Sequence, residues 1–302
     1  MRPSIIALFF GLFSVTAHAA PAPNVLVSIK PLHSIVAAVM EGAGTPELLL
    51  TGAASPHSYA LKPSDARKIA RADMIFWTGP VLETFLATPL ATLGRRARVV
   101  ALSDAEGVTR LPARKGGVWE ADEDDDSLGG IDGHVWLDPR NAIAMAGDVA
   151  RILGAADPSH AKLYAANSQA FVARVMRLDA QLSRELEPIR PSPYLLFHDA
   201  FHYFEARYGL SPMGAVTVAS DRPPGVRRVE ILRARIKAAG AICVFSTPQF
   251  SPRLLPALIQ GSAARSAVLD DLGADIPAGP ELYEALLVRI SEQLRSCLNR
   301  RT

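Results

Sequence analysis

The chain has 302 residues, of which 49% are hydrophobic and 21% charged, and its formal net charge at pH 7 is +2. This hydrophobic content is enough for one large core or two cores of ordinary size. The basic residues are scattered rather than gathered into a stripe, so we expect no nucleic-acid partner.

The first residues predict a cleavable signal peptide over residues 1–19. Arg2 supplies a positive charge, residues 5–15 are apolar, and Ala17-His18-Ala19 fits the small-x-small site of signal peptidase. The apolar run is about half of the ~20 residues that a helix needs to span a bilayer, and no cysteine follows the cleavage site for lipid attachment. We therefore expect a periplasmic protein that does not itself span the membrane.

The first part of the mature chain alternates short apolar runs with amphipathic segments. We expect strands at residues 24–29, 46–50, 74–78 and 98–102, with helices at 33–40 and 64–71. Strands separated by helices of about ten residues indicate βαβ units and a parallel sheet. Residues 20–156 are therefore interpreted as an N-terminal α/β lobe.

An acidic run interrupts this lobe. Residues 120–126 contain six acidic residues in seven, between two glycine pairs. Such a run repels itself and predicts an exposed loop over about 116–133. A cation-collecting arm beside a metal site is the alternative, and the composition leaves both interpretations open.

A long helix is predicted over residues 157–187. Asp157 is a suitable N-cap, and Pro158 fits the first helical position. No proline or glycine follows until residue 188, and apolar residues recur at helical spacing. About 30 residues give a helix near 45 Å long, which could join two domains as a stiff connector. Strands expected at 194–197, 215–218, 241–245 and 266–269 then form a C-terminal α/β lobe over residues 188–302.

The two cysteines, Cys243 and Cys297, lie in a chain that we expect to be exported, where a disulfide is the default. A disulfide that closes the loop between these two cysteines would stabilise the fold by about 4 kcal/mol in the chain-entropy model. A cysteine pair in a metal site is the alternative, but the spacing has no CxxC character.

Three histidines share a position relative to the predicted strands. His198 closes the strand at 194–197, His57 follows the strand that ends near residue 50, and His134 follows the acidic run. Asp270 occupies the end of the strand at 266–269. Ligands of open α/β sheets bind at the carboxyl ends of strands. Three imidazoles and one carboxylate form a suitable ligand set for Zn²⁺.

Several separated motifs, in order along the chain, resemble those of the zinc-specific periplasmic solute-binding proteins of ABC importers. They include SIKP at 28–31, SPHSY at 55–59, LKPSD at 61–65, HVWLDP at 134–139, FHDA at 197–200 and LDDLG at 269–273. The resemblance implies two Rossmann-like lobes, a rigid connecting helix and a metal site in the cleft between the lobes. It also implies delivery of zinc to an ABC permease in the inner membrane, and it supports the Cys243–Cys297 disulfide.

The same resemblance places the metal ligands of the family at His57, His134 and His198. Histidine rather than glutamate at the third position goes with zinc receptors, and glutamate goes with manganese receptors. The fourth position falls on Asp270, with water as the alternative. Some relatives use a glutamate before the first histidine, but this chain has Pro56 there.

One feature departs from the pattern of the family. Many zinc receptors carry a histidine-rich loop before the second ligand, whereas residues 116–133 of this chain contain no histidine. Carboxylates alone favour harder cations, so no high-affinity auxiliary zinc site is expected there.

The other histidines receive structural interpretations. His33 is expected to be structural and His160 exposed, while His202, at i+4 from His198, is a candidate neighbour of the ligands. Trp136 is expected to pack close to His134.

Three other functions fit the sequence less well than zinc capture. A manganese receptor and a surface adhesin of the same fold are disfavoured by His198 and by the absence of a lipid-anchor cysteine. A zinc hydrolase would need a general base, and the chain has no HExxH motif. We therefore expect a monomeric, non-catalytic zinc-binding protein.

Overall fold

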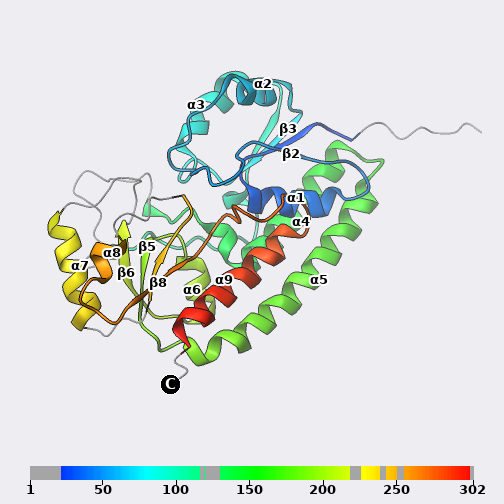
Figure 1. The fold of residues 1–302 in the computed structure, drawn as a ribbon. Coiled ribbons are helices and arrows are strands. Elements are labelled where there is room, and N and C mark those ends of the chain that lie inside the picture. The colour runs from blue at the N-terminus through cyan, green and yellow to red at the C-terminus, as the bar shows by residue number, and fades with distance from the viewer. Residues whose placement is uncertain are drawn as a thin grey trace, which may run out of the picture.

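The computed structural model describes residues 22–115, 119, 130–217, 226–238, 243–249 and 255–299. The chain forms two lobes, each built on a four-stranded parallel sheet, as Figure 1 shows. The two-lobed α/β fold predicted from the sequence is confirmed. The predicted signal peptide and the acidic run at 120–126 lie outside the described residues.

The N-terminal lobe holds the first sheet, with strand order β2-β1-β3-β4. Its strands are β1 (Val25–Val27), β2 (Glu47–Leu48), β3 (Met74–Trp77) and β4 (Arg98–Ala101). Its helices are α1 (Lys30–Met40), α2 (Pro63–Arg71) and α3 (Thr84–Leu93), and the 3-10 turn η1 (Leu102–Asp104) follows β4. Strands β1 and β3 are buried along their whole length, as expected for the centre of a parallel sheet covered on both faces.

Two helices follow the N-terminal sheet in the chain. The turn η4 (Val135–Leu137) leads into α4 (Pro139–Ala156), which the sequence analysis did not anticipate. Asp138 caps α4 by accepting the Arg140 amide N–H, and Pro139 occupies the first helical position. These are the same N-terminal signals that were assigned to the next helix, at Asp157 and Pro158.

The long helix α5 (Ala161–Leu186) has 26 residues and is about 39 Å long. It starts later than predicted, so Asp157 as its N-cap is wrong. Asp157 instead closes α4, and its carboxylate accepts hydrogen bonds from Ser159 Oγ (2.5 Å) and Tyr164 Oη (2.8 Å). The chain therefore turns between the two helices, which pack against each other as a hairpin.

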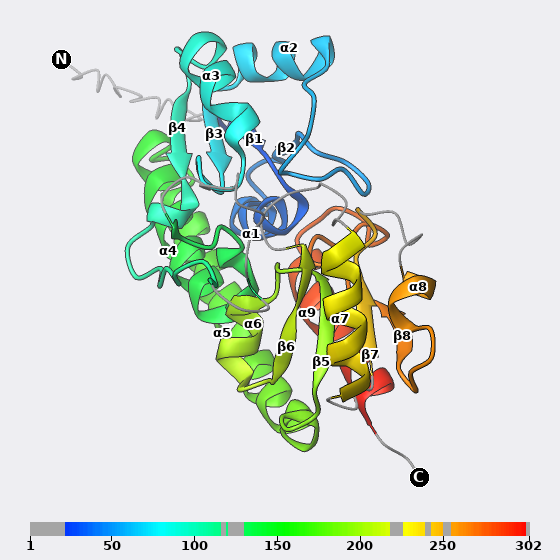
Figure 2. The same cartoon turned by 90° about the vertical axis from the view of Figure 1, so that its left-hand side faces the viewer.

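The C-terminal lobe follows the short turn η5 (Glu187–Ile189). Its sheet has the order β6-β5-β7-β8, formed by β5 (Tyr194–His198), β6 (Pro212–Thr217), β7 (Cys243–Ser246) and β8 (Arg265–Val268). Its helices are α6 (His202–Tyr208), α7 (Val226–Ala238), α8 (Leu255–Ile259) and α9 (Leu282–Leu298). Figure 2 shows α7 on one face of this sheet and α9 on the other.

One hydrophobic core extends through both lobes. A single cluster of buried side chains runs from Val25 in β1 to Leu298 in α9, and α5 packs against α1, α4 and α9. In Figure 1, α5 runs alongside both lobes. A smaller cluster, which includes Leu195 and Leu232, packs β5 against α7. No helix of the described part of the chain is long and apolar enough to cross a bilayer.

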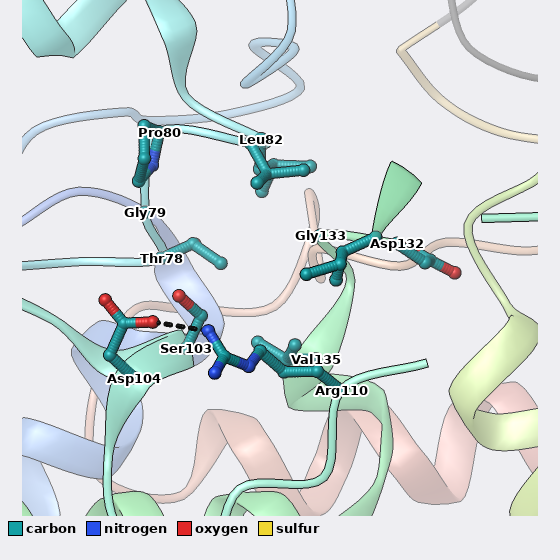
Figure 3. A pocket seen from close by; sticks show the side chains of 12 residues that line it. Thr78, Gly79, Pro80, Leu82, Ser103, Asp104, Arg110, Asp132, Gly133 and Val135 are labelled. Carbon is teal, nitrogen blue, oxygen red and sulfur yellow. Dashed lines mark hydrogen bonds and ion pairs between the residues drawn. The ribbon is translucent and has the colours of Figure 1, made fainter. Parts of the chain in front are cut away.

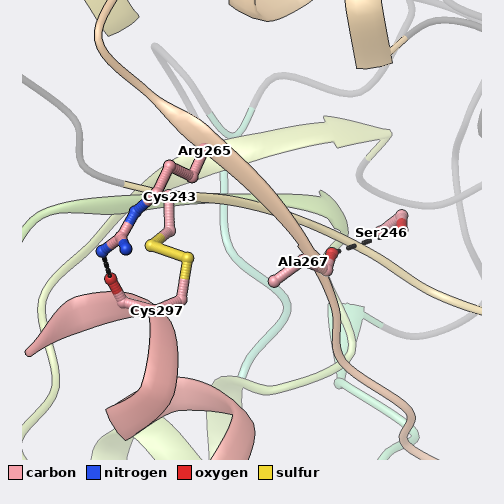
Figure 4. The surroundings of a disulfide bond; sticks show 5 residues. All are labelled: Cys243, Ser246, Arg265, Ala267 and Cys297. Atoms are coloured by element: carbon pink, nitrogen blue, oxygen red, sulfur yellow. Dashed lines mark hydrogen bonds between the residues drawn. A yellow bond between two sulfur atoms is a disulfide. The ribbon is translucent and has the colours of Figure 1, made fainter.

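The predicted disulfide is present. Cys243 at the start of β7 and Cys297 near the end of α9 are joined with a Cα–Cα distance of 6.2 Å, as Figure 4 shows. The guanidinium of Arg265 also donates a hydrogen bond to the Cys297 carbonyl. The disulfide therefore ties α9, the last helix of the chain, to the middle of the second sheet.

Candidate metal centre

Three histidines from separate parts of the chain meet between the lobes. His57 lies in the loop between β2 and α2, His134 directly before η4, and His198 is the last residue of β5. Nε2 of His134 lies 3.3 Å from Nε2 of His57 and 3.4 Å from Nε2 of His198. One ring nitrogen of each lies within 4.8 Å of the other two.

The three rings differ in exposure. His134 and His198 are buried, with 4% and 3% of their surface exposed, whereas His57 is half-buried. The residues after His57, from Ser58 to Ala60, are half-buried or exposed. His134 and His198 are therefore enclosed by the protein, and His57 is the most accessible of the three rings.

Asp132 fixes the orientation of His134. Its Oδ1 accepts hydrogen bonds from the His134 backbone N–H at 2.9 Å and from Nδ1 at 2.7 Å. Tyr203 Oη in turn donates to the Asp132 carbonyl at 2.8 Å. With the proton on Nδ1, Nε2 of His134 presents its lone pair to the other two rings, as in carboxylate–histidine–metal arrangements. Asp132 was not among the residues predicted for the site, although its place two residues before His134 was a usable signal.

Burial and charge set the protonation of the group. Burial and the neighbouring imidazoles lower the pKa of His57 to about 3 and that of His198 well below its ordinary value. Both rings are therefore neutral at pH 7, which is the form that binds a metal. Burial opposes the charging of His134 as well, but the Asp132 carboxylate outweighs it and raises the pKa of His134.

Asp270 lies outside the group of three histidines. Its Oδ1 accepts the amide N–H groups of Leu272 and Gly273 at 3.0 and 3.1 Å, and its Oδ2 accepts that of Ala274 at 2.5 Å. Both oxygens thus close the turn after β8. Asp270 as a metal ligand stays a prediction.

Trp136 links the histidines to that turn. It is fully buried, and its ring centroid lies 5.4 Å from that of His134, which confirms the expected packing. Its Nε1 donates to the Asp271 carbonyl at 2.9 Å. The Asp271 carboxyl is buried too, and this burial raises its pKa to about 7.

Of the remaining histidines, His33 and His202 lie in the surroundings expected from the sequence, and His160 does not. Nε2 of His33 lies 3.0 Å from the Pro46 carbonyl oxygen, a structural contact within the N-terminal lobe. Nδ1 of His202 lies 3.6 Å from Asp132 Oδ2, so His202 neighbours the residue that orients His134. His160 is less exposed than expected, because its Nδ1 lies 2.6 Å from the Asp157 carboxylate.

Arg114 joins the lobes beside His198, and the sequence analysis did not single it out. Its guanidinium donates to Asp199 Oδ1 at 2.9 Å and to Glu205 Oε2 at 2.6 Å. Both carboxylates are buried, and Tyr194 Oη also donates to Glu205. Burial raises the pKa of Asp199 to about 7, an effect that the charge of Arg114 opposes. Arg114 therefore neutralises the charge of two buried carboxylates, one of which, Asp199, follows the candidate ligand His198 in the chain.

A separate cavity of about 150 Å³ lies between the segment that carries Asp132 and the residues that follow β3 and β4, as Figure 3 shows. Thr78, Ser103 and Arg110 line it, and Arg110 is paired with Asp104. In Figure 3 the Asp132 carboxylate points away from these side chains. None of the three histidines lines this cavity.

Comparison with known proteins identifies the family. The model of the family "Zinc-uptake complex component A periplasmic" matches residues 25–297. The chain belongs to this family. It is 41% identical to the "High-affinity zinc uptake system protein ZnuA" of Brucella suis biovar 1, with 98% of each chain covered. The protein of the same description from Yersinia pestis is 35% identical, with 91% of each covered.

Solved structures agree in fold. A crystal structure of ZnuA matches with a TM-score of 0.79 at 24% identity, covering 92% of this chain and 100% of that chain. A laminin-binding adhesin from Streptococcus agalactiae matches with a TM-score of 0.78 at 22% identity, with the same coverage. At these identities the structures show the shared fold alone. The family resemblance seen in the sequence motifs is confirmed by the family model and the relatives.

Proposed function

We propose that this protein captures Zn²⁺ in the periplasm with high affinity and delivers it to an ABC permease in the inner membrane. The observation that carries the proposal is the convergence of three imidazole nitrogens from both lobes within 4.8 Å. Family membership supports it, because the relatives from Brucella and Yersinia are named as high-affinity zinc uptake proteins.

We infer that His57, His134 and His198 are the zinc ligands. Two ligand nitrogens about 2.0–2.1 Å from a tetrahedral zinc ion lie roughly 3.3–3.4 Å apart. The Nε2 separations of 3.3 and 3.4 Å fit this spacing. The fourth position is taken by Asp270 or by water.

The donor set also argues against the alternatives. Mn²⁺ stands at the weak end of the divalent affinity order and prefers oxygen ligands, so three nitrogen ligands favour zinc. A hydrolase would need a carboxylate or histidine free to act as a base beside a metal-bound water. Asp132 is hydrogen-bonded to His134, and Asp270 to three backbone amides. We therefore propose a binding protein without catalysis.

The proposed export route and lobe boundaries follow the sequence. Residues 1–19 are removed as a signal peptide, and the mature chain acts as a monomer. Residues 20–156 form the first lobe, 157–187 the connector and 188–302 the second lobe. The permease is the proposed partner, and no nucleic acid is involved.

Metal analysis of the purified mature protein tests the proposal. We expect one tightly bound zinc per chain, lost in His134→Ala and retained in the matched control His160→Ala, because His160 pairs with Asp157 away from the group. Competition between Zn²⁺ and Mn²⁺ tests the choice of metal. If Mn²⁺ displaced Zn²⁺ at comparable concentration, the protein would be a manganese receptor.

A further inference from the structure

Lys30, at the start of α1, is a buried cation whose hydrogen bonds all go to the other lobe. Only 8% of its surface is exposed. Its Nζ donates to the carbonyl oxygens of Gly273, Ala274 and Ile276, at 2.7, 2.8 and 2.7 Å. Three donors matched to three acceptors satisfy an ammonium group that would otherwise be costly to bury.

The acceptors lie on the turn that Asp270 closes from within. The Asp270 carboxylate accepts the amide N–H groups of residues 272–274, while the Lys30 ammonium donates to the carbonyl oxygens of Gly273, Ala274 and Ile276. The Asp270 carboxylate thus binds the amide groups of the turn, and the Lys30 ammonium binds its carbonyl oxygens. The cation belongs to the N-terminal lobe, so this turn of the C-terminal lobe cannot shift without breaking contacts between the lobes.

A continuous series of contacts leads from this turn to the zinc ligands. Asp271, at the start of the turn, accepts a hydrogen bond from Trp136 Nε1, and the Trp136 ring lies against His134. One helical turn after Lys30, Ser34 Oγ donates to the Pro280 carbonyl and accepts the Tyr283 amide N–H. Tyr283 Oη in turn donates to the Trp136 carbonyl at 2.8 Å. One face of α1 therefore supports Trp136 from two directions.

We propose that Lys30 is a positioning residue for metal retention: it holds the 270–276 turn against the N-terminal lobe and so keeps Trp136 and His134 in the geometry that retains the ion. This inference rests on the proposed function, because it concerns how long the histidine group keeps its zinc. Lys30 touches no candidate ligand and acts through the turn and Trp136. Its loss should therefore raise the rate of zinc release more than it changes the rate of capture.

The test compares Lys30→Met with Lys68→Met. Lys68 also donates to a backbone carbonyl, that of Leu48 at 2.8 Å, but this contact stays within the N-terminal lobe. Zinc association and chelator-induced dissociation are measured for the full mature chain. We expect dissociation from Lys30→Met to be about tenfold faster, with association within about twofold of the wild type. We expect both rates of Lys68→Met to be unchanged.

A merely structural role of Lys30 would give a different result. It would lower the fraction of chains that bind zinc and leave the dissociation rate of the remaining chains unchanged, which would overturn the inference. If the wild type bound no zinc, the proposed function itself would fail, so the two failures are distinguishable.

Amide hydrogen exchange of the wild type keeps the inference testable if Lys30→Met does not fold. Zinc should slow exchange at the amides of Leu272, Gly273 and Ala274, because retention and the held turn support each other. The Leu49 amide, which donates to Val27 in the N-terminal sheet, serves as the internal control. Equal exchange at residues 272–274 with and without zinc would contradict the inference.

Discussion

The two sheets share one strand order, yet they use the carboxyl end of their first strand in different ways. In the C-terminal lobe that end is His198, a candidate ligand. In the N-terminal lobe the residue directly after β1 is Ser28, which lies with Thr78 beside the buried carboxyl of Glu83. Glu83 accepts the Thr78 amide N–H at 2.6 Å. The first sheet therefore ends in a closed polar cluster, and its lobe supplies His57 and His134 from loops instead.

This difference shows that equal topology does not give equal sites. His198 is held by the second sheet, because it ends the central strand β5 and is paired there with Thr217 of β6. A ligand on a loop needs other support, which His134 obtains from Asp132 and Trp136. His57 is half-buried and lies in the exposed part of its loop. We therefore expect the C-terminal lobe to supply the fixed part of the site and the His57 loop the adjustable part.

The largest expected effect concerns Arg114, which compensates carboxylates of the C-terminal lobe from a loop before it. Arg114→Met leaves Asp199 and Glu205 buried without their cation, and should lower the free energy of unfolding by about 3–5 kcal/mol. Urea unfolding of the metal-free protein measures this. The matched control is Arg151→Met, whose exposed pair with Asp148 should contribute less than about 1 kcal/mol. Equal losses of unfolding free energy in the two variants would show that the C-terminal lobe, the fixed part of the site, does not depend on Arg114.

Removing one ligand at a time compares the fixed and adjustable parts directly. Structural zinc sites bind with about 10–16 kcal/mol, so one of four ligands contributes roughly 3 kcal/mol. His198→Ala should lose about that much affinity, because its ligand position is enclosed. His57→Ala should lose about 1 kcal/mol less, since water can enter on the side of its loop. Competition with a chelator gives both values. A larger loss in His57→Ala than in His198→Ala would reverse the comparison.

Glu83, at the carboxyl end of the first sheet, should make the free energy of unfolding of the metal-free protein depend on pH. Burial raises the pKa of Glu83 from 4.5 to about 7, although the Ser28 and Thr78 hydroxyls and the backbone partly oppose this. The folded state therefore keeps this proton up to a higher pH than the unfolded state. The contribution of Glu83 to stability is fully present below pH 4.5 and is lost as the pH rises to about 7, by roughly 3 kcal/mol.

Glu83→Gln removes this titration while keeping the shape of the side chain. The difference in unfolding free energy between the variant and the wild type should grow in favour of the variant from pH 5 to pH 8, as urea titrations at several pH values would measure. Asp199 and Asp271, whose pKa values are also raised to about 7, titrate in both proteins and cancel in the difference. A difference that stays constant with pH would refute the assignment.

The smallest expected effect concerns the fourth zinc position. The Asp270 carboxylate accepts three backbone amides, and the Oδ1 of asparagine can keep part of these bonds. With water as the fourth ligand, Asp270→Asn should lower zinc affinity by less than about tenfold, or 1.4 kcal/mol. A loss close to that of His198→Ala would establish Asp270 as a ligand and extend the fixed part of the site.

Much of this architecture was predictable because it depends on local patterns. The buried strands β1 and β3 are short apolar runs, and the three histidines follow strands or lie in motifs of the family. Asp157 was assigned to the wrong helix, because α5 starts only at Ala161; Asp157 follows the end of α4, where its backbone N–H donates to the Leu153 carbonyl. Lys30 and Arg114 act through partners more than 80 residues away in the sequence, which only the folded chain brings near. No periodicity reports such contacts.

The continuous core has a consequence for how the molecule unfolds. Because buried side chains from β1 to α9 form one cluster, and the 270–283 segment of the second lobe is bonded to α1, the surface between the lobes is interior rather than interface. The lobes are then units of topology but not independent cooperative units. Neither half would keep its core if expressed alone, and calorimetry of the whole chain should record one transition in which both sheets melt together. Loss of either sheet would disperse the three histidines, so the candidate metal site exists only while the whole chain is folded.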